Sequence, residues 1–211
     1  MQARESVVTR APPGPATDTK TRPGAILQRV MTDTGDRSRP SGRDASGQGP
    51  VLEGARVRVE PISHERALAL LAGHPEPGSR WEQGFPAPAL LASLRGVLRA
   101  GVGPGWFGPF YAYVVVRRQD GLTVGDAGFF GPPGDDGEVE VGYALVPRAR
   151  GCGLAVEAVE LLAGWALAQP GVRALTARVE ADNAASLRVL ARLGFVPDGR
   201  SGPYLRYVLR P

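Results

Sequence analysis

The stretch from Pro147 to Ala158 constrains the fold of this chain more than any other. A strand-like run, 138–146, leads into it, and a helix-like run, 154–168, leads out of it. Amides in the first turn of a helix have no acceptor within the helix, and the helix dipole favours negative charge there. Gly151 and Gly153 allow the backbone to approach a ligand without side chains in the way. The pattern therefore predicts a phosphate-binding loop.

The two ends of the chain differ in composition. Residues 1–54 are rich in Pro, Gly, Ser, Thr, Asp and Arg, and hydrophobic residues occur there singly. Such a segment cannot bury enough apolar surface to offset the entropy lost on ordering. We therefore predict a disordered tail over residues 1–54 and a folded domain over residues 55–211. A translation start at Met31 is an alternative explanation for the first part of the tail.

Charge and cysteine content narrow the class of protein. The single cysteine, Cys152, excludes an intramolecular disulfide, which fits a reducing cytoplasm. No apolar run approaches about 18 residues and no apolar signal core begins the chain, so we expect neither a membrane span nor secretion. The net charge of +4 is small and dispersed, which argues only weakly for a nucleic-acid partner. Nucleic-acid binding through the arginine-rich tail is an alternative function, and a homodimer is compatible with the sequence.

Hydrophobic periodicity and turn signals predict a mixed α/β (α+β) fold. An antiparallel front half precedes a β-α-β unit around the glycine loop. Ser63 is expected to cap the first helix, and Gln119-Asp120-Gly121 to join two strands as a hairpin. The other predicted elements are strands at 56–60, 110–117, 122–130, 174–180 and 204–209, and helices at 89–100 and 183–193.

Four blocks, in order, carry a resemblance to a known family. Arg150-Gly151-Cys152-Gly153-Leu154-Ala155 fits the pattern Gln/Arg-x-x-Gly-x-Gly/Ala, as does a second frame over 148–153. The strand residues 140–145 precede it, and Asp182-Asn183-Ala184-Ala185-Ser186 with Leu193-Gly194-Phe195 follow it. Asp126-Ala127-Gly128-Phe129-Phe130-Gly131 adds to the likeness. The chain resembles the GNAT superfamily of N-acetyltransferases, especially the branch that contains the ribosomal-protein N-terminal acetyltransferases.

The resemblance implies the GNAT fold, a mostly antiparallel sheet that splays open at a cleft for acetyl-CoA. Pyrophosphate would lie on the amides of residues 150–155, the pantetheine arm beside 141–146, and the thioester carbonyl near the amide of Leu145. No metal is expected, because two histidines without a cysteine cluster do not make a zinc site. The residues expected to bind the cofactor are Leu145, Val146, Arg150, Gly151, Cys152, Gly153, Leu154, Ala155, Asn183 and Ser186.

The resemblance also suggests catalytic residues. Glu140 matches a carboxylate that removes the proton of the amine, with Glu138 in reserve; a salt bridge is the alternative for both. Ser186 matches a polar neighbour of the thiol, although Asn183 and Ser186 also suit the start of a helix. The family often has a tyrosine as the acid for the leaving thiolate, and here that position is Leu190.

These implications lead to one expected function and one alternative. We expect an acetyl-CoA-dependent N-acetyltransferase, an acyltransferase whose acceptor is a primary amine of a protein N-terminus or a small molecule. Because Leu190 replaces the tyrosine, a non-catalytic module that binds and senses acyl-CoA is the alternative. The sequence itself does not identify the acceptor.

Overall fold

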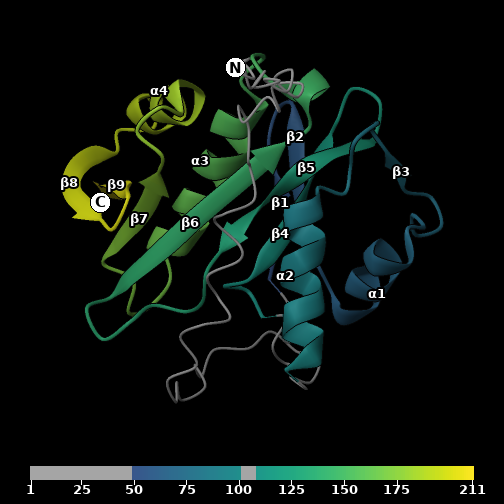
Figure 1. Cartoon of the computed structure of the whole chain (residues 1–211), viewed down its shortest axis with the longest axis horizontal. Coiled ribbons are helices and arrows are strands. Elements are labelled where there is room, and N and C mark those ends of the chain that lie inside the picture. Colours follow the sequence, from purple (N-terminus) through teal and green to yellow (C-terminus); the bar gives the residue numbers. More distant parts are fainter. Residues whose placement is uncertain (1–48, 101–107) are drawn as a thin grey trace, which may run out of the picture.

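The computed structural model describes residues 49–100 and 108–211, which form a mixed sheet with helices on both faces (Figure 1). Residues 1–48, which are most of the predicted tail, and residues 101–107 lie outside the described residues. The first described strand, β1 (Leu52–Glu53), already pairs with the sheet. Paired structure thus begins two residues before the predicted end of the tail.

The described strands run in the order β1-β2-β4-β5-β6-β7-β9-β8, and β3 pairs with β5 outside this path. All neighbours are antiparallel except β3 with β5 and β6 with β7. The predicted antiparallel front half and β-α-β back half are therefore confirmed. The further strands are β2 (Val57–Pro61), β3 (Arg80–Trp81), β4 (Ala112–Arg117), β5 (Leu122–Phe129), β6 (Glu138–Leu145), β7 (Ala174–Val179), β8 (Val196–Ser201) and β9 (Tyr204–Leu209).

Each helix begins within one residue of its predicted start. In α1 (His64–Ala72) the Ser63 hydroxyl accepts a hydrogen bond from the amide of Arg66 at 3.0 Å. α2 (Pro88–Arg99) begins with a proline, which is suited to a first helical turn. α3 (Leu154–Leu167) and α4 (Ala184–Arg192) flank β7 in the chain. In Figure 1, α2 lies in front of the sheet and α3 lies behind β6.

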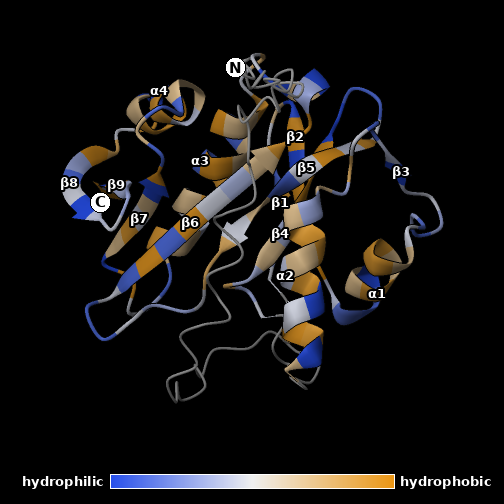
Figure 2. Ribbon diagram, viewed as in Figure 1, coloured by the Kyte–Doolittle hydropathy of each residue, from blue (hydrophilic) through white to orange (hydrophobic). Residues whose placement is uncertain are grey.

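The core lies where the central strands meet α3. β4 is buried along nearly its whole length, and hydrophobic residues dominate it. Trp165 of α3 packs against the rings of Phe110 and Phe129, with centroids 5.0 and 5.8 Å apart. Figure 2 shows the contrast with β8, which is mostly hydrophilic. Burial of these central elements fixes β5 and β6, the two strands that matter for the site.

β8 is a strand that the pattern did not predict. Its sequence contains Pro197 and Gly199, both poor strand formers, and the ladder with β9 is irregular between Pro197 and Arg200. It is the edge strand of the sheet, where a proline costs no ladder hydrogen bond on its open side. The position at the edge overrides the local signal.

Candidate functional site

The sheet opens between β6 and β7, and the gap between the diverging strands is the candidate cleft. These strands pair only over residues 138–140 with 174–176, whereas residues 141–145 pair with β5 alone. Along β7, pairing with β9 continues to Val179. The two strands therefore diverge from Val141 onward, as the resemblance implies for an acetyl-CoA cleft.

The diverging half of β6 presents backbone groups to this cleft. Toward β5, the Glu140 carbonyl accepts a hydrogen bond from the amide of Phe130, and the Val146 amide donates one to the carbonyl of Val124. Because backbone groups alternate sides along a strand, those of Val141, Tyr143 and Leu145 point away from β5 and into the cleft. An extended chain could therefore bond to this edge as an added strand.

The glycine loop follows directly. Pro147–Ala149 form one 3-10 turn, Gly151 and Gly153 adopt φ values of 80° and 81°, and α3 begins at Leu154. The first bond of the helix runs from the amide of Glu157 to the carbonyl of Gly153 at 3.2 Å. The amides that precede Glu157 therefore have no acceptor within the helix and are suited to bind an anion. A Cβ built on Gly151 meets nothing within 4 Å among the described atoms, so the loop is open to a ligand on that side.

Two further loop residues point back toward the protein. Arg150 donates from Nε to the carbonyl of Leu145 at 2.8 Å, which joins the loop to the end of β6. The Cys152 thiol donates to the carbonyl of Ala149 at 3.3 Å, although Cys152 as a residue is exposed. Leu154 is buried in the core, and Ala155 is half-buried. Of the loop residues predicted to bind the cofactor, Arg150, Gly151 and Cys152 are therefore exposed, whereas Leu154 belongs to the core.

Arg56 holds the loop from behind, a contact that the sequence did not predict. Its guanidinium donates to the carbonyls of Cys152 (2.8 Å) and Gly153 (3.4 Å). The same group donates from Nε to Glu157 at 2.7 Å, and the Arg56 amide bonds to the other Glu157 oxygen at 2.7 Å. β2 and the first turn of α3 are thereby joined, and the loop carbonyls are satisfied on the side away from the cleft.

Glu157 is the anchor of this arrangement. Burial would raise the pKa of its carboxyl, but hydrogen bonds from the Arg56 amide, the Arg56 guanidinium and the Val57 amide together lower the pKa below its ordinary value. Glu157 is therefore held as an anion. Its charge also lies in the first turn of α3, where the helix dipole favours it.

A pocket of about 250 Å³ lies beside the loop, where β5, the end of β6 and the start of α2 meet. Its walls are mainly apolar, and Phe85, which packs edge-on against Trp81 at 5.7 Å, forms one of them. The predicted residues Leu145, Val146 and Arg150 border it. The described lining residues are Gly84, Phe85, Ala87, Pro88, Gly125, Asp126, Ala144, Leu145, Val146, Pro147 and Arg150.

Asp126 is the acidic residue among those lining residues, and the sequence reasoning did not assign it a role. It lies on β5 directly opposite Ala144 of β6, and it is 4% exposed. Burial raises the pKa of its carboxyl from 3.8 to about 7. The available signal was a single carboxylate within an otherwise apolar strand, Thr123-Val124-Gly125-Asp126-Ala127.

Glu140 lies further along β6 and is bound in an ion pair. Arg178 of β7 donates to both of its oxygens, with Nε 2.7 Å from Oε1. Glu138 is similarly paired with Arg206, which also contacts Asp198. Neither glutamate borders the pocket as described. The salt bridges that the sequence left open are therefore present, and the role of Glu140 as a base stays a prediction.

Asn183 and Ser186 lie across the cleft at the start of α4. The Asn183 side chain accepts from the amide of Ser186 at 3.1 Å, which makes Asn183 the N-cap of the helix. The Tyr143 hydroxyl donates to the Ser186 carbonyl at 3.4 Å, linking β6 to α4. Leu190, at the position of the expected tyrosine, is buried at 1% exposure. Contacts of Asn183 and Ser186 with a cofactor remain predictions.

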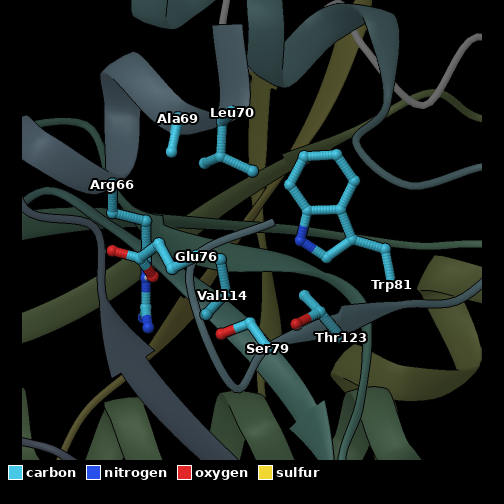
Figure 3. Close-up of a pocket in the computed structure, with 8 residues that line it drawn as sticks. All are labelled: Arg66, Ala69, Leu70, Glu76, Ser79, Trp81, Val114 and Thr123. Carbon is cyan, nitrogen blue, oxygen red and sulfur yellow. The ribbon is translucent and has the colours of Figure 1, made fainter. Parts of the chain in front are cut away.

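A second hollow lies under α1 (Figure 3). Trp81 faces Leu70 and Ala69 there, and Arg66 lies beside Glu76 at the opposite wall. Its volume is about 10 Å³, room for about one water molecule and no acceptor. Trp81 thus packs the loop behind the larger pocket, whereas Phe85 lines it.

Two observations concern other kinds of site. Among residues 49–100 and 108–211, no group of three or more His, Cys, Asp or Glu side chains is arranged to hold a metal ion. None of the helices within those same ranges combines the length and apolar character needed to cross a membrane.

The family comparison covers most of the domain. The model of the acetyltransferase (GNAT) domain matches residues 56–196. An uncharacterized N-acetyltransferase of Bacillus subtilis (strain 168), YjdG, is 35% identical over 99 residues, which span 47% of this chain and 59% of that relative. The alignment therefore covers less than two thirds of the relative's own length.

Solved structures share the fold. An acetyltransferase from Agrobacterium tumefaciens str. C58 is 23% identical, with a TM-score of 0.56 over 83% of this chain and 100% of that one. A ribosomal-protein-S5-alanine acetyltransferase from Vibrio fischeri is 18% identical, with a TM-score of 0.54 over 76% and 96%. At these identities the likeness concerns the fold alone.

Proposed function

Because the chain belongs to the GNAT acetyltransferase family, we propose that it transfers an acetyl group from acetyl-CoA to a primary amine. The observation that carries the proposal is the divergence of β6 and β7 beside an amide-lined loop, together with a pocket that borders the same loop at Pro147 and Arg150. A site suited to phosphates thus lies next to a space large enough for a reacting group.

The residues along this path suit acetyl-CoA. Of the predicted amides of residues 150–155, that of Arg150 bonds to the Pro147 carbonyl at 3.2 Å. The amides of residues 151–155 would therefore bind the pyrophosphate, and the open side of Gly151 leaves room for it. The β6 edge at Val141, Tyr143 and Leu145 would bond to the pantetheine arm as an added strand. When bound, the thioester supplies an activated acetyl carbon, and the Leu145 amide would stabilise charge on its oxygen.

The acceptor must lose a proton before or during transfer. An α-amine has a pKa of about 7.7–8.0 and a lysine amine about 10.4, so an α-amine needs less help at neutral pH. Glu140 is the base that the resemblance suggests, and Ser186 the polar neighbour of the thiol. In the structure, Arg178 occupies both oxygens of Glu140, so its role needs a direct test.

A primary amine of either a protein N-terminus or a small molecule fits the proposal. The V. fischeri enzyme of the same fold is described as acting on alanine of a ribosomal protein, which makes peptides that begin with alanine a sensible first choice. A cytoplasmic location and a homodimer remain open to experiment.

An acceptor screen tests the function. Purified full-length protein is mixed with acetyl-CoA and a panel of N-terminal peptides and small amines, and release of the coenzyme thiol is followed. We expect release that depends on one class of amine, with the acetylated amine found by mass spectrometry. Tight binding of acetyl-CoA without turnover on any amine would favour the acyl-CoA sensor instead. Absence of both binding and turnover would contradict the proposal.

A further inference from the structure

The pocket between β5, β6 and α2 contains a carboxylate that nothing in the described chain neutralises. Asp126 is 4% exposed, and within the described residues no hydrogen bond to its side chain is formed. Buried carboxylates are normally paired or hydrogen-bonded, because burying an unpaired charge is costly. An unpartnered one that borders a pocket is available to a partner that the described residues do not supply.

The charged groups around the pocket are engaged elsewhere. Arg150, the other charged lining residue, donates from Nε to the Leu145 carbonyl. On the elements packed against β5, Glu82 beside the loop is bound to Arg117 of β4, and Glu140 of β6 is bound to Arg178. α2 has no charged residue before Arg95. A cation that enters the pocket would therefore find Asp126 as its counter-ion.

Position also favours Asp126 over Glu140. Asp126 lies opposite Ala144, next to the Leu145 amide that would bind the thioester oxygen. Facing residues of an antiparallel pair have Cα atoms about 4.5–5.5 Å apart. Glu140 is four residues before Ala144, about 13 Å along the strand. A group that acts on the attacking amine belongs at the Ala144 end.

We propose that Asp126 receives the acceptor as an ammonium ion and takes a proton from it, so that Asp126, rather than Glu140, is the catalytic base. This inference rests on the proposed acetyl transfer. One proton passes from the ammonium nitrogen to the carboxylate. The nitrogen then bonds to the acetyl carbon as the carbon–sulfur bond breaks. A second nitrogen proton passes to the departing thiolate, and Asp126 finally releases its own proton to solvent.

This sequence of steps also accommodates Leu190. The thiolate takes its proton from the nitrogen, so a tyrosine at position 190 is not required. Burial places the pKa of Asp126 at about 7, close to that of an α-amine, and a base works well when its pKa is near the working pH. The volume of about 250 Å³ and the walls formed by Phe85, Ala87 and Pro88 favour an amine with a small apolar body.

The test compares wild type with Asp126→Asn and, as a matched control on the same sheet face, Glu140→Gln. Alaninamide is the probe, and aspartic acid α-amide is its acidic counterpart. Acetyl-CoA affinity and alaninamide affinity are measured by calorimetry, and kcat/KM is measured from pH 5.5 to 9. Thermal melts establish that each variant is folded, and Asp126→Ser replaces Asp126→Asn if that variant fails to fold.

We expect Asp126→Asn to lower kcat/KM for alaninamide by about 10²–10⁴-fold, with acetyl-CoA affinity within twofold of wild type. Alaninamide should bind at least tenfold more weakly to the variant, and aspartic acid α-amide should be the poorer ligand of wild type. Wild-type kcat/KM should peak between about pH 7 and 8, whereas the Asp126→Asn profile should only rise with pH.

Three results would overturn the assignment. One is an unchanged kcat/KM in Asp126→Asn. A second is that Glu140→Gln, rather than Asp126→Asn, loses the fall of kcat/KM at low pH. The third is that alaninamide binds wild type and Asp126→Asn with equal affinity, or binds neither. This result comes from binding alone and can be obtained even if no amine is acetylated. A wild type that binds alaninamide through Asp126 but acetylates no amine would refute the proposed function while leaving the amine site in place.

Discussion

The glycine loop and the pocket beside it differ in how their charged side chains are paired. At the loop, Arg56 and Glu157 satisfy each other and the loop carbonyls. At the pocket, the Asp126 carboxylate is buried without a partner among the described residues. Satisfied polar groups rigidify a structure, and unsatisfied ones destabilise it. The difference indicates that the loop is prebuilt to hold a ligand, whereas the pocket retains a costly group that a reactant can use.

The largest expected effect is on stability at the pocket. Asp126 has a pKa of about 7 in the fold against an ordinary 3.8, so the fold favours its protonated form. This contribution to stability is complete below about pH 3.8 and is lost as pH rises toward 7. Asp126→Asn should therefore be more stable than wild type above pH 7, by on the order of 4 kcal/mol.

Urea unfolding of both proteins at pH 5 and pH 8 measures this difference. The gap between variant and wild type should widen from pH 5 to pH 8. An equal gap at the two values, or a variant that is less stable at pH 8, would mean that the Asp126 carboxylate is satisfied in the folded protein.

The second effect is expected behind the loop. Glu157→Ala removes the acceptor for the Arg56 and Val57 amides and for the guanidinium. We expect a loss of about 2–3 kcal/mol in the free energy of unfolding, because hydrogen bonds to a charged group are broken. Glu157→Gln keeps an oxygen acceptor and should lose about half as much. Denaturant titrations measure both. Equal losses in the two variants would assign the whole effect to the charge of Glu157, and no loss in Glu157→Gln would assign it to the acceptor oxygens and packing.

The third effect concerns the binding of the donor at the loop. Gly151 has a positive φ and open space around it, so Gly151→Ala and Gly151→Glu share the same backbone strain. Only glutamate adds a negative charge beside the proposed pyrophosphate site. We expect the Kd for acetyl-CoA to be at least tenfold higher in Gly151→Glu than in Gly151→Ala, which corresponds to a loss of about 1.4 kcal/mol of binding free energy. Calorimetry measures both, and identical affinities would argue against phosphate at this loop.

The smallest effect separates the two roles of Asn183. Serine at this position can still cap α4, while alanine cannot, so Asn183→Ala should lose about 1 kcal/mol of stability and Asn183→Ser much less. If Asn183 also contacts acetyl-CoA, both variants should bind it a few-fold more weakly. Acetyl-CoA affinity and melting temperature are measured on the same samples. If Asn183→Ser binds acetyl-CoA as tightly as wild type, Asn183 only caps the helix.

The sequence predicted the loop well because the signal is local. Glycines at 151 and 153, a strand before them and a helix after them specify a strand-turn-helix without reference to the rest of the chain. Ser63 and Asn183 cap their helices for the same reason. Capping hydrogen bonds form between residues that are close in sequence, whatever surrounds the segment, so short sequence patterns predict them.

The contacts that the sequence missed are all long-range. Arg56 and Glu157 are 101 residues apart in the chain, and the alternating Arg-Val-Arg-Val at 56–59 predicts a strand but no partner for Arg56. Asp126 looks like an ordinary polar residue until the register places it opposite Ala144 and beneath Phe85. Its burial, and therefore its pKa, is a property of three elements that only the fold brings together.

The most direct test of the account is an amide NMR titration of the labelled protein with acetyl-CoA. We predict the largest shifts at residues 151–155 and along the β6 edge from Val141 to Leu145, with a smaller shift at Arg56 behind the loop. Subsequent addition of alaninamide should shift the amides around Asp126 and Ala144. Shifts centred elsewhere, or an amine response confined to the surroundings of Glu140, would contradict it.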